Sequence, residues 1–325
     1  MTLKTFRNCA LAAAMAIAAG AAQAQIKIAL DSPQDLQGSG SYVWAHTFST
    51  YLNENGLEAE EYQRGALGGD DELFDQVSQG LLEVSMSPLN IVGSIDKLIY
   101  GLRLPYFFES MEQVDKALYD NGMLEKINAA TAPEGVRVIA VDTVGPPTGI
   151  FNTKKPVKSV ADMAGLRMRA LDESQIELYE AWGASGTIVS WAEVPNALQT
   201  GVADGYMNPS FVPLLFGHTD FIKFFTDAKV SPSLRIAIVS EDWYQGLSDE
   251  DRAIVDAAVE AANTANREWL ATQDSVLDKL VEAGVAIEEL SPEAWAEFRE
   301  ASAPAYESDL ITPDQLAQWE AAKGD

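Results

Sequence analysis

The fold of this chain is decided by two stretches of its sequence, PVKSVADMAGLRMRA at residues 156–170 and SWAEVPNALQTGVADGYMNP at residues 190–209. The first predicts a helical turn, a glycine turn at Gly165 and a short strand over 166–169. The second predicts a helix that begins near Trp191 and a strand that follows it. Strand, helix and strand in close succession are typical of an α/β fold.

Two arginines stand out in the first stretch. Side chains alternate along a strand, so Arg167 and Arg169 are expected on one face and Leu166 and Met168 on the other. The chain has 49 acidic and only 22 basic residues, and α/β folds place their ligand sites at strand ends. Two arginines at such an end therefore indicate an anion-binding site, with a plain surface arginine as the alternative.

Short strands and helices alternate along the rest of the chain, which predicts an α/β protein with mostly parallel sheets. A long helix is expected from the Ser-Asp-Glu-Asp cap at 248–251 to about residue 283, and such a helix would brace two lobes. We predict strands over 26–30, 57–62, 81–86, 136–141, 187–189, 205–208 and 234–240, and helices over 41–52, 70–79, 111–118, 123–129, 173–182 and 191–200.

Residues 1–24 are predicted to be an export signal. Lys4 and Arg7 precede a core of small apolar residues, and Ala22-Gln23-Ala24 is typical of a cleavage site. We therefore expect a periplasmic protein. The only cysteine, Cys9, lies in this leader, so the mature chain is expected to form no disulfide and no thiolate metal site.

The roughly 300 residues after the leader exceed the usual size of a single core, which predicts two lobes. We place lobe I at 25–145 plus 234–273 and lobe II at 146–233 plus 274–325, with hinge segments near residues 145 and 233. The formal net charge of −27 argues against nucleic acid or an anionic membrane as partners, because phosphates bind clustered Lys and Arg. An anionic ligand would need a local positive site to overcome this overall field.

Several motifs, taken together and in order, resemble the solute-binding subunit of TRAP transporters, the tripartite ATP-independent periplasmic systems, of the DctP type. They are GALGG at 65–69, LPYFF at 104–108, DMAGLRMR at 162–169, ALQTGVADG at 197–205 and NP at 208–209. The resemblance covers most of the chain after the leader. It implies a two-lobed periplasmic binding protein fold with hinge strands and a long lobe-spanning helix. It also implies that the protein captures a small organic acid and delivers it to TRAP membrane subunits.

The resemblance assigns binding roles to three residues. In the family, the arginine that ends the strand forms a salt bridge with the ligand carboxylate, and this position is Arg169, with Arg167 as a flanking charge. A guanidinium group offers a planar fork of donors that matches a carboxylate. Asn208 matches an asparagine that orients the same carboxylate, or it is a turn residue before Pro209. Trp191 matches an aromatic wall of the cleft, with core packing as its alternative.

Two acidic residues fall where lobe I can face the cleft. Asp31 follows the first predicted strand and Asp70 begins a predicted helix, so both can accept hydrogen bonds from ligand hydroxyl groups. Asp70 is as readily explained as a helix N-cap.

The chain also departs from the sialic-acid-binding members of the family. These carry a second arginine where this chain has Thr148, and a glutamate where it has Ser87 and Pro88. The cleft thus loses a charge of each sign and gains apolar surface, with Tyr206 and Phe211 nearby. This predicts a small monocarboxylate, aromatic or branched-chain, as the ligand of a protein that we expect to be monomeric.

Two other functions remain open from the sequence. An exported hydrolase would have to rely on carboxylates, because the chain has only His46 and His218, no G-x-S-x-G motif and no metal-ligand cluster. A binding protein for an ATP-driven importer or a sensor would share the fold class and differ only in the family motifs. No cofactor is expected, since the glycine turns at 38–40 and 65–69 fit neither a Walker nor a dinucleotide pattern.

Overall fold

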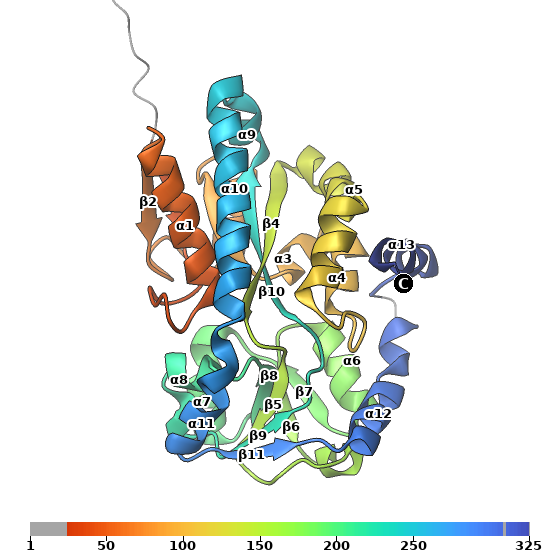
Figure 1. The fold of residues 1–325 in the computed structure, drawn as a ribbon. Helices are drawn as coiled ribbons and strands as arrows, with labels where there is room; N and C mark the ends of the chain where they lie inside the picture. Colours follow the sequence, from red (N-terminus) through yellow and green to blue (C-terminus); the bar gives the residue numbers. More distant parts are fainter. Residues whose placement is uncertain (1–24, 308–309, 325) are drawn as a thin grey trace, which may run out of the picture.

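The computed structural model describes residues 25–307 and 310–324. The predicted leader, with Cys9, lies outside these residues. Two sheets, each covered by helices on both faces, form two lobes that meet across a waist (Figure 1). The two-lobed α/β fold predicted from the sequence is confirmed.

The first lobe is built on a five-stranded sheet. Its order is β2-β1-β3-β10-β4, and β10 runs antiparallel to both of its neighbours. Trp44 and Phe48 of α1 pack with Val255 and Ala258 of α10 over one face. Helices α2, α4 and α5 cover the other face. The elements are β1 (Ile26–Ala29), α1 (Gly40–Glu54), β2 (Ala59–Tyr62), α2 (Asp70–Ser78), β3 (Val84–Ser87), α3 (Asn90–Gly93), α4 (Met111–Asp115), α5 (Met123–Thr131), β4 (Val136–Gly145), β10 (Ser233–Ser240), α9 (Glu241–Gly246) and α10 (Asp249–Leu270).

The second lobe is built on a six-stranded sheet of order β11-β9-β5-β8-β6-β7. Helices α6 and α12 bury Tyr179 and Phe298 against one face, and α7, α8 and α11 cover the other. The elements are β5 (Gly149–Asn152), β6 (Arg167–Ala170), α6 (Glu173–Ala181), β7 (Ser185–Ile188), α7 (Val194–Thr200), β8 (Gly205–Asn208), α8 (Val212–Leu215), β9 (Phe224–Asp227), α11 (Val276–Glu282), β11 (Ala286–Glu289) and α12 (Pro292–Ala301).

The long helix predicted to reach residue 283 is shorter than expected. Helix α10 ends at Leu270, and a short turn separates it from α11. The Thr272 hydroxyl donates to the Trp269 carbonyl at 2.7 Å, so a local side-chain bond takes the place of helix continuation. The break lies at the waist, where α10 leaves the first lobe and α11 joins the second (Figure 1).

The C-terminal helix α13 (Pro313–Lys323) packs on the first lobe, and the sequence wrongly assigned it to the second. Trp319 is fully buried there and donates a hydrogen bond to the Leu98 carbonyl at 2.7 Å. Gly101 makes this possible, because a Cβ atom at that position would lie 2.0 Å from the Trp319 ring nitrogen. The chain therefore returns to the first lobe at its end.

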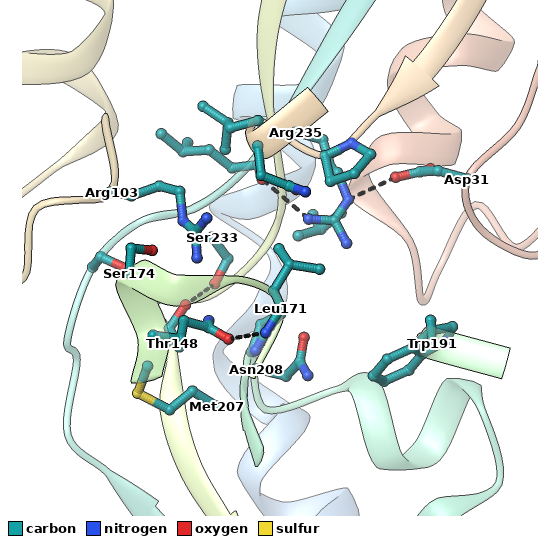
Figure 2. Close-up of a pocket in the computed structure, with 18 of the residues that line it drawn as sticks. Asp31, Arg103, Thr148, Leu171, Ser174, Trp191, Met207, Asn208, Ser233 and Arg235 are labelled. Atoms are coloured by element: carbon teal, nitrogen blue, oxygen red, sulfur yellow. Dashed lines mark hydrogen bonds and ion pairs between the residues drawn. The ribbon is translucent and has the colours of Figure 1, made fainter. Parts of the chain in front are cut away.

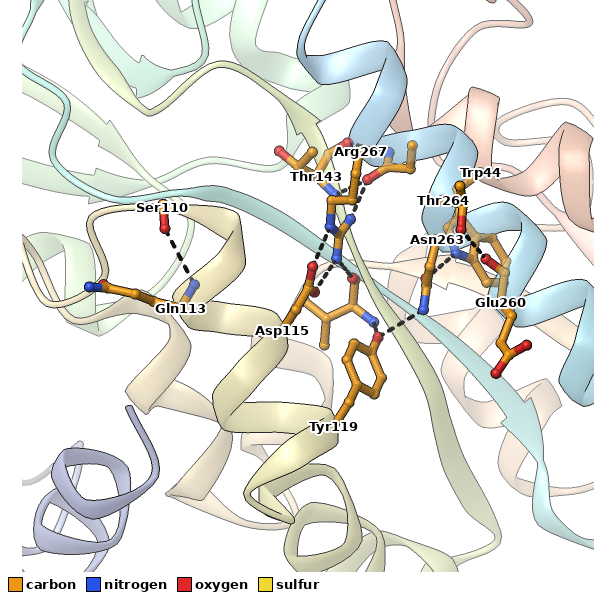
Figure 3. A network of polar contacts seen from close by, with 12 residues as sticks. Trp44, Ser110, Gln113, Asp115, Tyr119, Thr143, Glu260, Asn263, Thr264 and Arg267 are labelled. Carbon is orange, nitrogen blue, oxygen red and sulfur yellow. Dashed lines mark hydrogen bonds and ion pairs between the residues drawn. The ribbon is translucent and has the colours of Figure 1, made fainter. Parts of the chain in front are cut away.

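Strands β4 and β10 connect the lobes, and α10 is fixed to β4 close to the crossing point (Figure 3). The Asn266 amide donates to the carbonyls of Gly40 and Thr143, both at 2.8 Å, and accepts from the Thr143 N–H at 3.0 Å. Arg267 donates to Asp115 at 2.7 Å and to the Val141 carbonyl at 2.9 Å. These bonds hold α1, α4, α10 and β4 as one body up to the hinge.

Within the described part of the chain, no helix is long and apolar enough to cross a membrane.

Candidate ligand-binding site

A cavity of about 590 Å³ lies between the two lobes. This volume falls within the range of about 300–1,000 Å³ that is typical of small-molecule sites. Charged side chains line it from both lobes, and the second lobe adds the Trp191 ring and the Asn208 amide (Figure 2). Its polar and aromatic lining residues include Asp31, Arg64, Asp70, Arg103, Thr148, Arg169, Trp191, Asn208, Phe211 and Arg235.

Arg169 is the lining residue most clearly prepared for an anion. It lies on β6 with 5% of its surface exposed, and its Nε donates to the Val189 carbonyl at 2.8 Å. Burial lowers the pKa of Arg169 to about 10, and the nearby guanidinium groups of Arg235 and Arg103 contribute to this, so the side chain stays charged at neutral pH. Across residues 25–307 and 310–324 it forms no ion pair. A buried charge without a counter-charge is costly, so this position favours an anionic ligand.

Asn208 ends β8, next to β6 in the sheet. Its Nδ2 is buried and has no hydrogen-bond partner within the described residues. Asn208 and Thr148 both line the cavity (Figure 2). An unused donor on the strand next to Arg169 can add a second hydrogen bond to the same anion.

Trp191 stands at the edge of the cavity and belongs to an aromatic cluster as well. Its ring lies 5.0 Å from Phe216, 5.2 Å from His218 and 5.9 Å from Tyr206, measured between ring centres. The Arg169 guanidinium lies 5.6 Å from the centre of the Trp191 ring, within the range of a cation–π contact. Burial lowers the pKa of His218 to about 4, so that ring is neutral at pH 7. Trp191 therefore both lines the cavity and packs within the aromatic cluster.

The other predicted residues of the second lobe lie at the hinge side of the cavity. Thr148 lines the cavity, and its hydroxyl is 2.9 Å from the Ser233 hydroxyl, which links the two crossing segments. Phe211 also lines the cavity and is buried against Gly145, where a Cβ atom would lie 2.2 Å from the Phe211 ring. Arg167 does not line the cavity and pairs with Asp204 through two nitrogens, at 2.8 and 3.0 Å.

Of the two acidic residues predicted in the first lobe, Asp31 is the more buried. Its two carboxylate oxygens are engaged by the Ser41 hydroxyl at 2.7 Å and by the Arg235 Nε at 3.0 Å. Asp70 is the first residue of α2, after an N-cap at Gly69, and lies 3.8 Å from Arg64.

Pro88 and Ser87 end up in different surroundings. Pro88 lines the cavity, whereas Ser87 is buried in β3 with its hydroxyl 3.1 Å from the Ser85 hydroxyl.

Three lining arginines escaped the sequence analysis. Arg64 donates to the Asp31 carbonyl, Arg103 is paired with Asp172, and Arg235 is paired with Asp31. A cation inside the apolar strand SLRIAIVS was the available signal for Arg235. The cavity is therefore lined by further arginines, each with an acidic partner, although position 148 is a threonine.

No group of three or more histidine, cysteine, aspartate and glutamate side chains is placed to hold a metal ion in the part of the chain that the structure describes.

Comparison with known proteins identifies the family. The DctP family profile, described as bacterial extracellular solute-binding protein, family 7, matches residues 29–311. The chain belongs to this family. The ectoine/5-hydroxyectoine-binding periplasmic protein UehA of Ruegeria pomeroyi is 30% identical over 92% of this chain and 90% of its own length. The ectoine-binding periplasmic protein TeaA of Halomonas elongata is 27% identical over 86% of this chain and 83% of its own.

Solved structures agree with the family assignment. The ectoine-binding protein of the TeaABC TRAP transporter of Halomonas elongata superposes with a TM-score of 0.83 at 25% identity, over 92% of this chain and 99% of that one. A TRAP solute-binding protein of Anaerococcus prevotii with bound glucuronate has the same fold, with a TM-score of 0.83 at 20% identity over 92% and 97% of the two chains. The prediction of a TRAP solute-binding subunit of the DctP type is confirmed. Members of the DctP family are periplasmic solute receptors and not enzymes.

Proposed function

We propose that this DctP-family receptor binds a small organic acid whose carboxylate is held by Arg169 and Asn208 in the cavity between the lobes. The observation that carries the proposal is the buried Arg169 guanidinium, which forms no ion pair with any described residue. Each hydrogen bond to a charged group contributes about 1.5–3 kcal/mol when water is excluded. The unused Asn208 donor would share the same carboxylate.

A single negative charge fits this cavity best. Arg103, Arg235 and Arg64 each have an acidic partner, in Asp172, Asp31 and Asp70 respectively. Arg169 is thus the lining arginine whose charge is left uncompensated among the described residues, and one carboxylate would balance it. An aromatic or branched side group of the ligand would pack on Trp191 and Phe211.

Ligand binding would close the two lobes. The chain passes between the lobes four times, after β4, before β10, at the break between α10 and α11, and between α12 and α13, and hinge closure around a ligand is a common mode of domain motion. Closure removes water from the Arg169 ion pair and strengthens it. The closed form would then be recognised by the TRAP membrane subunits, with the receptor acting as a monomer in the periplasm after removal of residues 1–24.

A thermal-shift screen of organic acids and neutral sugars tests this proposal. A ligand at a hundred times its Kd adds about 2.7 kcal/mol to the free energy of unfolding. For a chain of this size that corresponds to a rise in Tm of roughly 4 °C. At least one monocarboxylate should produce such a shift. Stabilisation by neutral sugars, with none by any acid, would contradict the proposal.

A further inference from the structure

Arg235 lines the cavity and has hydrogen-bond donors that are not used. It projects from β10 in the wall of the first lobe, and 29% of its side chain is exposed (Figure 2). Its Nε is taken by Asp31 at 3.0 Å, and its Nη1 is 3.4 Å from the Leu234 carbonyl. Within the described residues its Nη2 makes no hydrogen bond. Arg235 therefore has donors to offer to a ligand.

Asp31 serves Arg235 and not the ligand. Only 3% of the Asp31 side chain is exposed, and both carboxylate oxygens are already bonded, one to Ser41 and one to Arg235. The low exposure of the Asp31 side chain leaves a ligand hydroxyl group little access to either oxygen. What Asp31 does is fix the guanidinium plane of Arg235 against the first lobe and balance its charge. Asp31 is thus a positioning residue for Arg235.

Arg169 and Arg235, two of the four arginines that line the cavity, differ in charge balance. Arg169 has no acidic partner among the described residues, whereas Arg235 is paired with Asp31 and lies opposite Asp142 in the register of β10 and β4. An anionic group beside Arg235 would also meet the negative charge of Asp31, and like charges at that distance repel each other. A neutral oxygen, such as a hydroxyl or a keto group, could accept from Arg235 without this penalty.

We propose that Arg235, positioned by Asp31, is a ligand-contacting residue that selects monocarboxylates bearing a hydroxyl or keto oxygen away from the carboxylate. The carboxylate binds Arg169 in the second lobe, and the neutral oxygen binds Arg235 in the first. A ligand that bridges both lobes in this way also favours closure. The inference rests on the proposed function, because it takes Arg169 as the carboxylate site.

The test compares sets of acids matched in length. Three such sets are butyrate, 4-hydroxybutyrate and succinate; pentanoate, 4-oxopentanoate and glutarate; and phenylacetate, 4-hydroxyphenylacetate and 4-carboxyphenylacetate. Affinities for the full mature chain are measured by isothermal titration calorimetry. In the set that fits the cavity, the hydroxy or oxo acid should bind at least tenfold more tightly than both its parent and the diacid. Equal affinity for the parent acid, or tighter binding of the diacid, would overturn the inference.

Two variants assign the preference to the residues. Arg235→Gln should reduce the difference between oxygenated acid and parent to less than threefold. Asp31→Asn should raise the affinity for the diacid at least tenfold, because Arg235 would then carry an uncompensated charge. Arg137→Gln is the matched control: it breaks an arginine–glutamate pair in the same sheet, with Glu241 at 2.6 and 2.9 Å, outside the cavity. It should leave the preference for the oxygenated acid over both the parent acid and the diacid unchanged.

Failure of the proposed function would look different. If no acid of any set binds the wild type, the carboxylate site itself is wrong, and the inference falls with it. If acids bind but Arg235→Gln keeps the tenfold preference, only the role of Arg235 is wrong. If circular dichroism shows that Arg235→Gln does not fold, the affinity of Asp31→Asn for the diacid tests the role of Arg235 in its place. An unchanged affinity of that variant for the diacid would overturn the inference.

Discussion

Asp142 should make the stability of this receptor depend on pH in an unusual direction. The side chain lies on β4 near the hinge, is fully buried, and has no hydrogen-bond partner on either carboxylate oxygen within the described residues. Burial, and then the nearby Asp31 carboxylate, raise the pKa of Asp142 from 3.8 to about 7. Arg267 and Arg235 oppose this effect without cancelling it.

The sign and size follow from linkage. A carboxyl group with a raised pKa in the folded state holds its proton there more tightly than in the unfolded chain, so the free energy of unfolding falls as pH rises. The loss begins near pH 4 and is complete above the folded pKa of about 7. A difference of about three pH units between the two states corresponds to roughly 4 kcal/mol, since each unit is worth 1.36 kcal/mol.

Urea unfolding of Asp142→Asn and wild type between pH 4 and pH 8 measures this contribution. Other carboxylates also titrate, so the informative quantity is the difference between the two proteins at each pH. We expect Asp142→Asn to gain up to about 4 kcal/mol on wild type across this range. Asp274→Asn, at an exposed site, is the control and should run parallel to wild type. A constant difference between Asp142→Asn and wild type would mean that Asp142 does not hold its proton more tightly in the folded state.

Three further predictions concern stability. His218→Gln should reduce the loss of stability on acidification. Because burial lowers the pKa of His218 from 6.5 to about 4, the free energy of unfolding of the wild type falls by about 3 kcal/mol as the pH drops from 6.5 to 4. Urea unfolding at pH 4 and pH 7 measures this difference. Asn266→Ala removes the four hydrogen bonds of a buried side chain, two of them with Thr143, and should lower the free energy of unfolding by about 2–4 kcal/mol; a loss below 1 kcal/mol would contradict the account. Gly101→Ala should displace Trp319 and cost about 1–3 kcal/mol, with a shift in tryptophan fluorescence; unchanged fluorescence and stability would argue against that packing.

The strands that carry the site were predictable because their sequences alternate or are uniformly apolar. Strand β8 was predicted with its observed bounds, Gly205–Asn208, and β10 within one residue. Strands β5, β9 and β11 were not predicted. They are four residues each, and their positions depend on neighbours in the sheet that are distant in sequence. The side to which α13 packs depends likewise on Gly101, which leaves room for Trp319.

The site residues also fall into a part that was predictable from the sequence and a part that was not. Family motifs lead to Arg169 and Asn208, because these residues stand at the ends of recognisable strands in the second lobe. The arginines of the first-lobe wall were not foreseen. Asp31 appeared as a free acceptor, yet its partner Arg235 lies 204 residues away in the sequence. Pairing of that kind becomes visible only when the fold brings β1 and β10 together.

The binding affinity of Arg169→Ala tests the central claim most directly. With the acid that most stabilises the wild type, calorimetry should show an affinity at least a hundredfold weaker, since two or more charge-assisted hydrogen bonds of about 1.5–3 kcal/mol each are lost. Arg167→Gln, on the same strand and outside the cavity, should bind as the wild type does. An Arg169→Ala protein that is folded and binds the acid within threefold of the wild type would contradict the account.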